Sequence, residues 1–133
     1  MHLLDTNICI FVLNRGPGFE RIIRRMDGLS RGDVLVSSVS AAELQFGAWA
    51  SARKQDNLLR LERFLAEFEV LPFEENAARA YGQLRAALKE LGTLIGPLDT
   101  LIAGHSLSIG ATLVTNNLRE FQRVPGLRAE DWS

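Results

Sequence analysis

Cysteine is nearly missing from the sequence: Cys9 is the only one among 133 residues. A single thiol forms no disulfide within the chain and cannot supply a zinc site built from several thiolates. Stability must then come from an apolar core, and a chain of this length buries enough surface to form one. We expect a single domain spanning residues 1–133, in a reducing compartment, because disulfide-linked domains belong to oxidising ones.

Long apolar segments are also missing. The longest stretch without a charged residue covers residues 100–118, and its histidine, serines, asparagines and glycines make it too polar for a membrane span. No basic segment followed by an apolar one comes before the first motif, so no signal peptide is expected. The sequence therefore predicts a cytoplasmic protein.

Neither sign of charge dominates, since 15 basic and 16 acidic residues give a net charge of −1. The total charge is thus no sign of nucleic-acid binding. Five arginines nevertheless fall close together: Arg15, Arg21, Arg24, Arg25 and Arg31. Arginine forks suit phosphate oxygens, although a solvated helix face is the better explanation for any one of these arginines.

Strand and helix patterns alternate along the chain. Strands are expected at residues 2–5, 33–37, 69–73, 111–115 and 127–132, the third of them at a sheet edge because Pro72 cannot donate to a neighbour. Helices are expected from about residue 7, at 19–26, from about residue 40, and at 56–67, 74–91 and 97–110. This alternation predicts an α/β fold, a three-layer sandwich around a mainly parallel central sheet of about four to five strands.

Five acidic or amide side chains follow these strands: Asp5, Glu43, Asp99, Asn117 and Glu120. The first ends the first strand, and the second lies one turn into the helix after the second strand. The third lies in the first turn of the helix that begins at Pro97, and the last two follow the fourth strand. Ligands of such sheets bind beyond the carboxyl ends of the strands, so we expect these side chains to converge there.

Each of these side chains also has a structural explanation when it is taken alone. Asp5 is placed to cap the following helix. Ser40 and Glu43 have the spacing of a capping box. Asp99 suits the positive end of a helix dipole, and Asn117 is placed to cap a short helix. None of these explanations accounts for the gathering of the acids at one edge.

Clustered carboxylates have a physical use, because like charges a few ångströms apart raise a pKa unless a cation separates them. Mg²⁺ or Mn²⁺ prefers oxygen ligands, binds phosphate oxygens and activates water. A histidine base is then unnecessary. His105 lies about 240° around its helix from Asp99, at ~100° per residue, so it is expected to pack elsewhere.

Four segments resemble the signature blocks of VapC-type PIN-domain toxins: residues 4–9 (LDTNIC), 37–47 (SSVSAAELQFG), 95–103 (IGPLDTLIA) and 113–121 (LVTNNLREF). The resemblance implies a Mg²⁺- or Mn²⁺-dependent endoribonuclease that cleaves tRNA or rRNA and arrests translation. In that family, residues matching Asp5, Glu43 and Asp99 are catalytic and hold the metal. The resemblance also implies a homodimer, inhibited by a VapB-type antitoxin through which operator DNA is bound.

The fourth position of the motif departs from the commonest pattern. Many PIN domains have aspartate where this chain has Asn117, whose amide oxygen brings no charge. Glu120, one turn further on, is an alternative. Both are second-tier candidates for binding metal or orienting water, and the number of metals bound stays open.

Three other functions compete with a nuclease. A phosphorelay receiver domain would want paired acids after the first strand and a late lysine, and no lysine follows Lys89. A phosphatase with Asp5 as nucleophile would want an Asp-x-Asp spacing, and Asn7 stands there instead. A PIN fold that binds RNA without cleaving it is disfavoured because all three family acids are present.

Apolar residues after Glu43 suggest a docking groove for the inhibitor's helix, unless they pack in the core: Phe46, Trp49, Leu58, Leu61 and Leu65. Trp49 is expected to be partly exposed. A basic side chain of the inhibitor is expected to pair with the acids.

Overall fold

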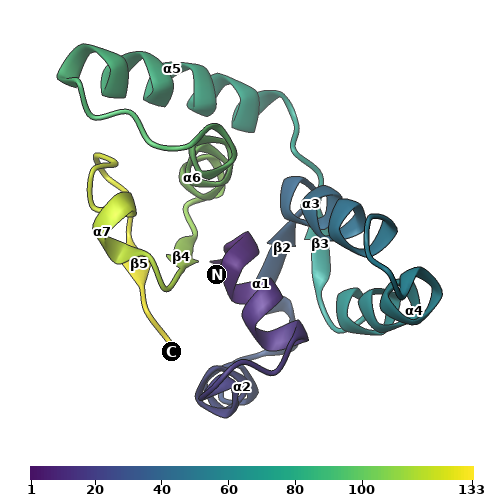
Figure 1. Cartoon of the computed structure of the whole chain (residues 1–133). Helices are drawn as coiled ribbons and strands as arrows, with labels where there is room; N and C mark the ends of the chain where they lie inside the picture. Colours follow the sequence, from purple (N-terminus) through teal and green to yellow (C-terminus); the bar gives the residue numbers. More distant parts are fainter.

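The computed structural model describes residues 1–133 and contains five short strands and seven α-helices (Figure 1). The strands are β1 (His2–Leu4), β2 (Val34–Ser37), β3 (Glu69–Leu71), β4 (Thr112–Val114) and β5 (Ala129–Glu130). The helices are α1 (Thr6–Leu13), α2 (Phe19–Asp27), α3 (Ser38–Trp49), α4 (Lys54–Leu65), α5 (Glu75–Leu91), α6 (Pro97–Ile109) and α7 (Leu118–Phe121). A 3₁₀ turn, Arg31–Asp33, precedes β2.

The strands form one sheet in the order β3-β2-β1-β4-β5, and every neighbouring pair is parallel. β1 lies at the centre, where Leu3 pairs with Leu35 on one side and Leu113 on the other. All five carboxyl ends therefore point to the same edge. The predicted parallel sheet is confirmed, and β3 is an edge strand as Pro72 required.

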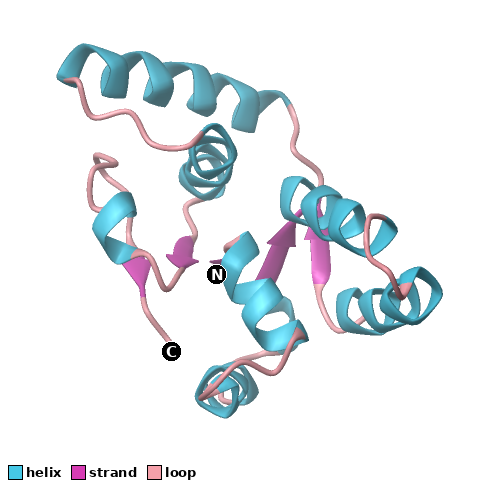
Figure 2. Ribbon diagram, in the orientation of Figure 1, coloured by secondary structure: helices cyan, strands magenta, loops and turns pink.

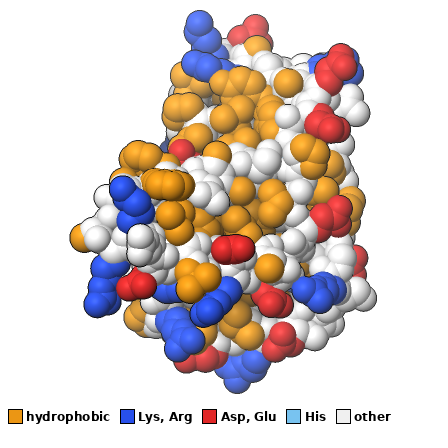
Figure 3. Space-filling model, turned by 90° about the vertical axis from the view of Figure 1, so that its right-hand side faces the viewer, with side chains coloured by type: hydrophobic (Ala, Val, Ile, Leu, Met, Phe, Trp, Pro, Cys, Tyr) orange, Lys and Arg blue, Asp and Glu red, His pale blue; other side chains and the backbone are white.

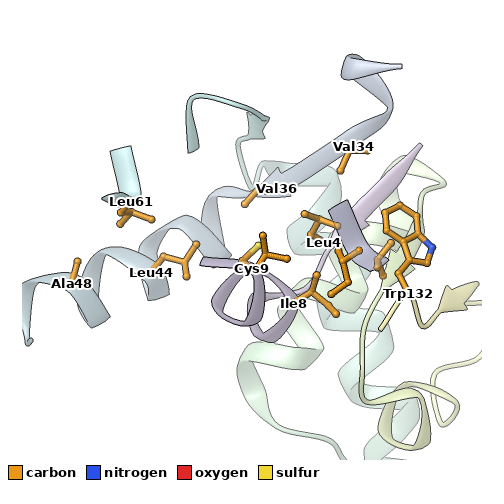
Figure 4. Close-up of a cluster of buried hydrophobic side chains, with 12 residues drawn as sticks. Leu4, Ile8, Cys9, Val34, Val36, Leu44, Ala48, Leu61 and Trp132 are labelled. Atoms are coloured by element: carbon orange, nitrogen blue, oxygen red, sulfur yellow. The ribbon is translucent and has the colours of Figure 1, made fainter. Parts of the chain in front are cut away.

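Helices cover both faces of the sheet (Figure 2), which confirms the three-layer sandwich. Alternate residues of each strand pack against the helices on opposite faces of the sheet. Leu4, Val36 and Val114 belong to the core under α1–α4 (Figure 4), whereas Leu3, Leu35 and Leu113 belong to the core under α5–α7. Because successive side chains of a strand point to opposite faces, these buried strands carry apolar residues at nearly every position.

Helix α6 packs closely along α5. A Cβ atom added at Gly104 of α6 would lie 2.9 Å from the backbone N and Cα of Tyr81 in α5, so only glycine fits there. Helices α5 and α6 are each followed by a glycine in the left-handed conformation, Gly92 and Gly110, which ends the helix. This contact fixes where α6, the helix that carries Asp99, runs across the sheet.

One expected helix start is wrong. Helix α3 begins at Ser38 rather than near Ser40, and Ser37 caps it by accepting a hydrogen bond from the Val39 amide at 3.1 Å. Ser40 therefore lies inside the first turn, is fully buried, and cannot form a capping box with Glu43. The reason is that β2 runs directly into α3 without a loop, so the capping serine is the last residue of the strand.

The apolar residues after Glu43 divide into two groups. Leu61 is buried, and Leu58 and Leu65 pack against the same core. Phe46 and Trp49 are 68% and 57% exposed. They belong to α3, which lies with α4 on the right of Figure 1, and Figure 3 shows apolar side chains gathered on that face. The expected exposure of Trp49 is confirmed, and the core explanation holds for the three leucines.

Two other expectations concern the surface. The five clustered arginines are all exposed, and Arg25 lies 3.4 Å from Glu130. None of the helices is both long and apolar enough to cross a membrane.

Candidate active site

Three acidic side chains approach one another at the carboxyl edge of the sheet. Asp5 follows β1, Asp99 lies in the first turn of α6, and Glu120 lies in α7 after β4. Strand β1 lies next to β4, so the segments that follow these two strands start side by side. Glu120 and Asp5 both raise the pKa of Asp99 by their charge, which places the three carboxylates within electrostatic reach of one another.

Asp5 is buried and uses only one of its two carboxylate oxygens. Oδ1 accepts a hydrogen bond of 2.7 Å from the Ile8 amide and so caps α1, which confirms the expected cap. Oδ2 is buried without a hydrogen-bond partner. Burial raises the pKa of Asp5 above its usual range, although the nearby Thr115 hydroxyl and the Ile8 amide oppose the shift. Capping thus accounts for Oδ1 of this carboxylate and leaves Oδ2 free for a ligand.

Asp99 and Glu120 form a close pair over Gly96. A Cβ atom at Gly96 would lie 3.5 Å from Asp99 Oδ2 and 3.8 Å from Glu120 Oε1. Burial, a hydrogen bond shared with Glu120 and the negative charges of Glu120 and Asp5 raise the pKa of Asp99 to about 7. The dipole of α6 favours the ionised form, so burial and the neighbouring carboxylates together outweigh the helix dipole here.

Two donors orient the Glu120 carboxylate. The Gly96 amide donates to Oε1 at 3.1 Å, and the Asn117 side-chain amide donates to Oε2 at 2.7 Å. Asn117 occupies the N-cap position of α7 but makes no capping bond with its side chain. The expected Asn117 cap is therefore wrong, because its side chain turns to Glu120 instead.

Glu43 is half-buried and lies apart from this trio in its contacts. It lines a cavity of about 310 Å³ between α1, α3 and α4, together with Asn14, Asn57 and Arg60. Arg60 donates to the Asn57 side chain at 3.2 Å, and Glu43 has no ion pair. No group of three or more His, Cys, Asp or Glu side chains is arranged to hold a metal ion as the side chains stand.

Two hydrogen bonds between side chains join the helices that carry the acids. Thr6, next to Asp5, bonds Ser40 of α3 with 2.8 Å between the hydroxyl oxygens. Ser37, the cap of α3, bonds Nδ1 of His105 in α6 at 2.8 Å. His105 is 2% exposed and its ring meets Phe73 edge-on, so it faces away from the acids as expected.

Comparison with known proteins gives the family. The family model described as PIN domain matches residues 2–127. The chain belongs to the PIN-domain family. Within that family it is 45% identical over 131 residues to the "tRNA(fMet)-specific endonuclease VapC" of Shigella flexneri, and the match covers 98% of this chain and 97% of the relative. Relatives named ribonuclease VapC, such as VapC2 of Rickettsia felis at 38% identity over 133 residues, cover 99% of this chain and place it among the VapC proteins.

Solved structures of VapC proteins have the same fold. The DNA-bound VapBC complex of Salmonella typhimurium contains a chain with a TM-score of 0.93 and 45% identity, covering 99% of this PIN domain and 98% of that chain. The VapBC2 complex of Rickettsia felis, bound to a promoter DNA fragment, gives a TM-score of 0.90 at 36% identity, with coverage of 99% and 98%. The expected PIN fold is confirmed.

Sequence reasoning identified the acids of this PIN domain but missed the polar residues that join their helices. It treated Ser40 as part of a capping box, and it treated His105 only as packing. Thr6, Ser37 and Thr115 were not singled out at all. Their position was the one available signal, because Thr115 directly follows a strand, Thr6 lies two residues after one, and Ser37 ends one.

Proposed function

We propose that this chain is a Mg²⁺- or Mn²⁺-dependent endoribonuclease, the toxin of a VapBC-type toxin–antitoxin pair. Its proposed site comprises Asp5, Asp99 and Glu120, with Glu43 joining when a cation binds. The observation that carries this proposal is the approach of three carboxylates, one with a free buried oxygen, at the sheet edge of a chain closely similar to named VapC endonucleases.

The donors at the site suit a hard divalent cation. Oδ2 of Asp5 is buried without a partner, and burial together with the neighbouring carboxylates raises the pKa of Asp99 to about 7. A cation of charge +2 would relieve both conditions, and carboxylate oxygens are the ligands that Mg²⁺ and Mn²⁺ prefer. When bound, the cation supplies charge neutralisation and activates water for attack on the phosphodiester.

The acidic side chains at the site have different roles. Asp5 is fixed by its bond to the Ile8 amide, so its free oxygen keeps one direction. Glu120 is fixed by the Gly96 amide and by Asn117. Asp99 holds the proton that must leave when a cation binds, so cation binding near pH 7 should release a proton.

Glu120, rather than Asn117, is our proposal for the fourth position. The charge of Glu120 acts on both Asp99 and Asp5, whereas Asn117 donates its amide to Glu120. Asn117 then orients the acid that replaces the aspartate found at this place in many PIN domains. It would have no direct bond to the cation.

The relatives suggest the substrate and the partner. The similar protein of Shigella flexneri is named a tRNA(fMet)-specific endonuclease, so the initiator tRNA is our proposed substrate and the cytoplasm our proposed location. Similar chains occur in VapBC complexes, so we propose a cognate VapB-type antitoxin as inhibitor, with operator DNA bound through it. A homodimer, and an antitoxin arginine or lysine paired with the acids, complete the proposal.

The test is cleavage of purified initiator tRNA and elongator tRNAs by the purified protein. Cleavage should require Mg²⁺ or Mn²⁺, stop with EDTA, and leave 5′-phosphate and 3′-hydroxyl ends. Asp99→Asn should abolish it while preserving the fold. Cyclic phosphate ends, or full activity in chelator, would refute the mechanism. Binding of tRNA without cleavage in Mn²⁺ would favour an RNA-binding PIN fold instead.

A further inference from the structure

The beginning of α3 is joined by buried hydroxyl groups to both helices that carry active-site aspartates. Ser37 and Ser40 are both completely buried. Ser40 bonds Thr6 at the start of α1, and Ser37 bonds His105 in the middle of α6. Helix α3 carries Glu43, the one family acid that has no contact with the other carboxylates.

The Ser37–His105 bond lies at the same distance along the chain from two of the acids. Glu43 is six residues after Ser37, and Asp99 is six residues before His105. At 1.5 Å per residue, each acid lies about 9 Å along its helix axis from the bond. A shift of either helix at this point therefore changes the separation of Glu43 and Asp99.

The hydrogen-bonding capacity of Ser37 is matched to this arrangement. Its oxygen accepts from the Val39 amide, which leaves its own proton free to donate to Nδ1 of His105. Burial lowers the pKa of His105, which favours the neutral ring, and in the tautomer that carries its proton on Nε2 the Nδ1 atom accepts from Ser37. One hydroxyl thus both begins α3 and binds it to α6.

A second pair of contacts surrounds this bond without reaching an acid. The Ser38 hydroxyl accepts from the Phe73 amide at 2.9 Å, and the Phe73 ring lies edge-on to His105 with 5.4 Å between ring centroids. Phe73 belongs to the link between β3 and α5, which carries none of the candidate site residues. Ser38 therefore offers a matched control in the same neighbourhood.

We propose that the Ser37–His105 hydrogen bond is a positioning contact that sets the separation of Glu43 and Asp99 needed to bind one divalent cation. This inference rests on the proposed metal-dependent function. His105 does not touch the cation or the RNA, because it is buried and its partners are Ser37 and Phe73. It acts through Ser37 on the placement of α3.

The test measures Mn²⁺ binding to the RNA-free protein by isothermal titration calorimetry, together with the melting temperature in EDTA. His105→Leu removes the bond and should weaken Mn²⁺ binding roughly 10-fold or more, the scale seen when residues that orient metal ligands are lost. His105→Asn, whose amide reaches nearly the position of Nδ1, should retain most of the affinity. Ser38→Ala should bind Mn²⁺ like the wild type.

Ser37→Ala removes the other partner of the same bond, and it keeps the test possible if His105→Leu does not fold. Ser37→Ala also loses the cap of α3, whereas His105→Leu keeps it. The double variant should bind Mn²⁺ no more weakly than the worse single variant, because both single variants already lack the Ser37–His105 bond. Equal loss of affinity in Ser38→Ala would mean general loosening and overturn the proposal, as would wild-type affinity in His105→Leu. A wild-type protein that bound no Mn²⁺ would overturn the proposed function itself.

Discussion

Asp99 should make the stability of the metal-free protein depend on pH. Its pKa is raised to about 7 by burial and by the carboxylates of Glu120 and Asp5, whereas an aspartate in an unfolded chain titrates near ~3.9. Between these values the folded protein holds a proton that the unfolded chain has lost. The contribution of Asp99 to the free energy of unfolding therefore falls as pH rises from about 4 to about 7.

The size of this effect follows from the shift. About three pKa units correspond to roughly 4 kcal/mol as an upper limit. The Asp99 side chain is half-exposed, and solvent screening reduces the figure to about 1–2 kcal/mol. For a chain of this length, that corresponds to roughly 3–8 °C in the melting temperature.

The assay is thermal unfolding in EDTA at a series of pH values from 4.5 to about 8, for the wild type and Asp99→Asn. The difference between the two melting temperatures reports Asp99 together with its coupling to Glu120 and Asp5, and it should favour the wild type increasingly as the pH falls. Glu90→Gln, a change at an exposed acid of α5, serves as a control and should leave the wild-type profile unchanged.

Binding of Mn²⁺ should restore the stability that the metal-free protein loses as the pH rises. At pH 7.5 and about 100 times its dissociation constant, a bound cation adds about 2.7 kcal/mol to the free energy of unfolding of the wild type. Asp99→Asn should gain much less. Parallel pH profiles for wild type and Asp99→Asn in EDTA would show that burial and the neighbouring carboxylates do not raise the pKa of Asp99, and the reasoning would fail.

Three further predictions concern the other acids. Asp5→Asn should abolish RNA cleavage without loss of stability, because asparagine still caps α1. Asp5→Ala should abolish cleavage and also lower the free energy of unfolding by about 1 kcal/mol. Turnover and urea unfolding measured on both variants separate the role of Asp5 in cleavage from its role as a cap. Glu43→Ala should abolish cleavage while changing the free energy of unfolding by less than about 0.5 kcal/mol, since no capping box exists, and a larger destabilisation with normal turnover would contradict this. Glu120→Gln should impair cleavage more than Asn117→Ala does. Asn117→Asp should also impair cleavage, because a second carboxylate would face Glu120 where an amide now donates. Initial cleavage rates decide the order, and improved activity of Asn117→Asp would count against this geometry.

The sequence predicted the layers and the edge where the acids gather, because apolar periodicity and parallel strands leave few alternatives. Strands of three residues were still recognisable because they are buried on both faces. The start of α3 could not be placed, since Ser37, Ser38 and Ser40 are all plausible caps. Only the tertiary contacts of Ser40 with Thr6 and of Ser37 with His105 choose among them.

The hydrogen-bond partners of the individual carboxylates could not be predicted from the sequence either. Spacing alone did not decide between Asn117 and Glu120, because the choice depends on how α7 turns beside Gly96. It also gave no sign that one oxygen of Asp5 caps a helix while the other stays free. Such details depend on side-chain direction and burial, which periodicity does not encode.

The close approach of α5 and α6 at Gly104 has a consequence for natural variation. Helix α5 spans 17 residues and carries none of the candidate site residues, yet its backbone at Tyr81 leaves no room for a methyl group on α6. A coding change of Gly104 to alanine would force the two helices apart and move Asp99 and His105 together. Loss-of-function alleles of this gene should therefore arise at Gly104 and along the facing side of α5, a helix without any candidate site residue.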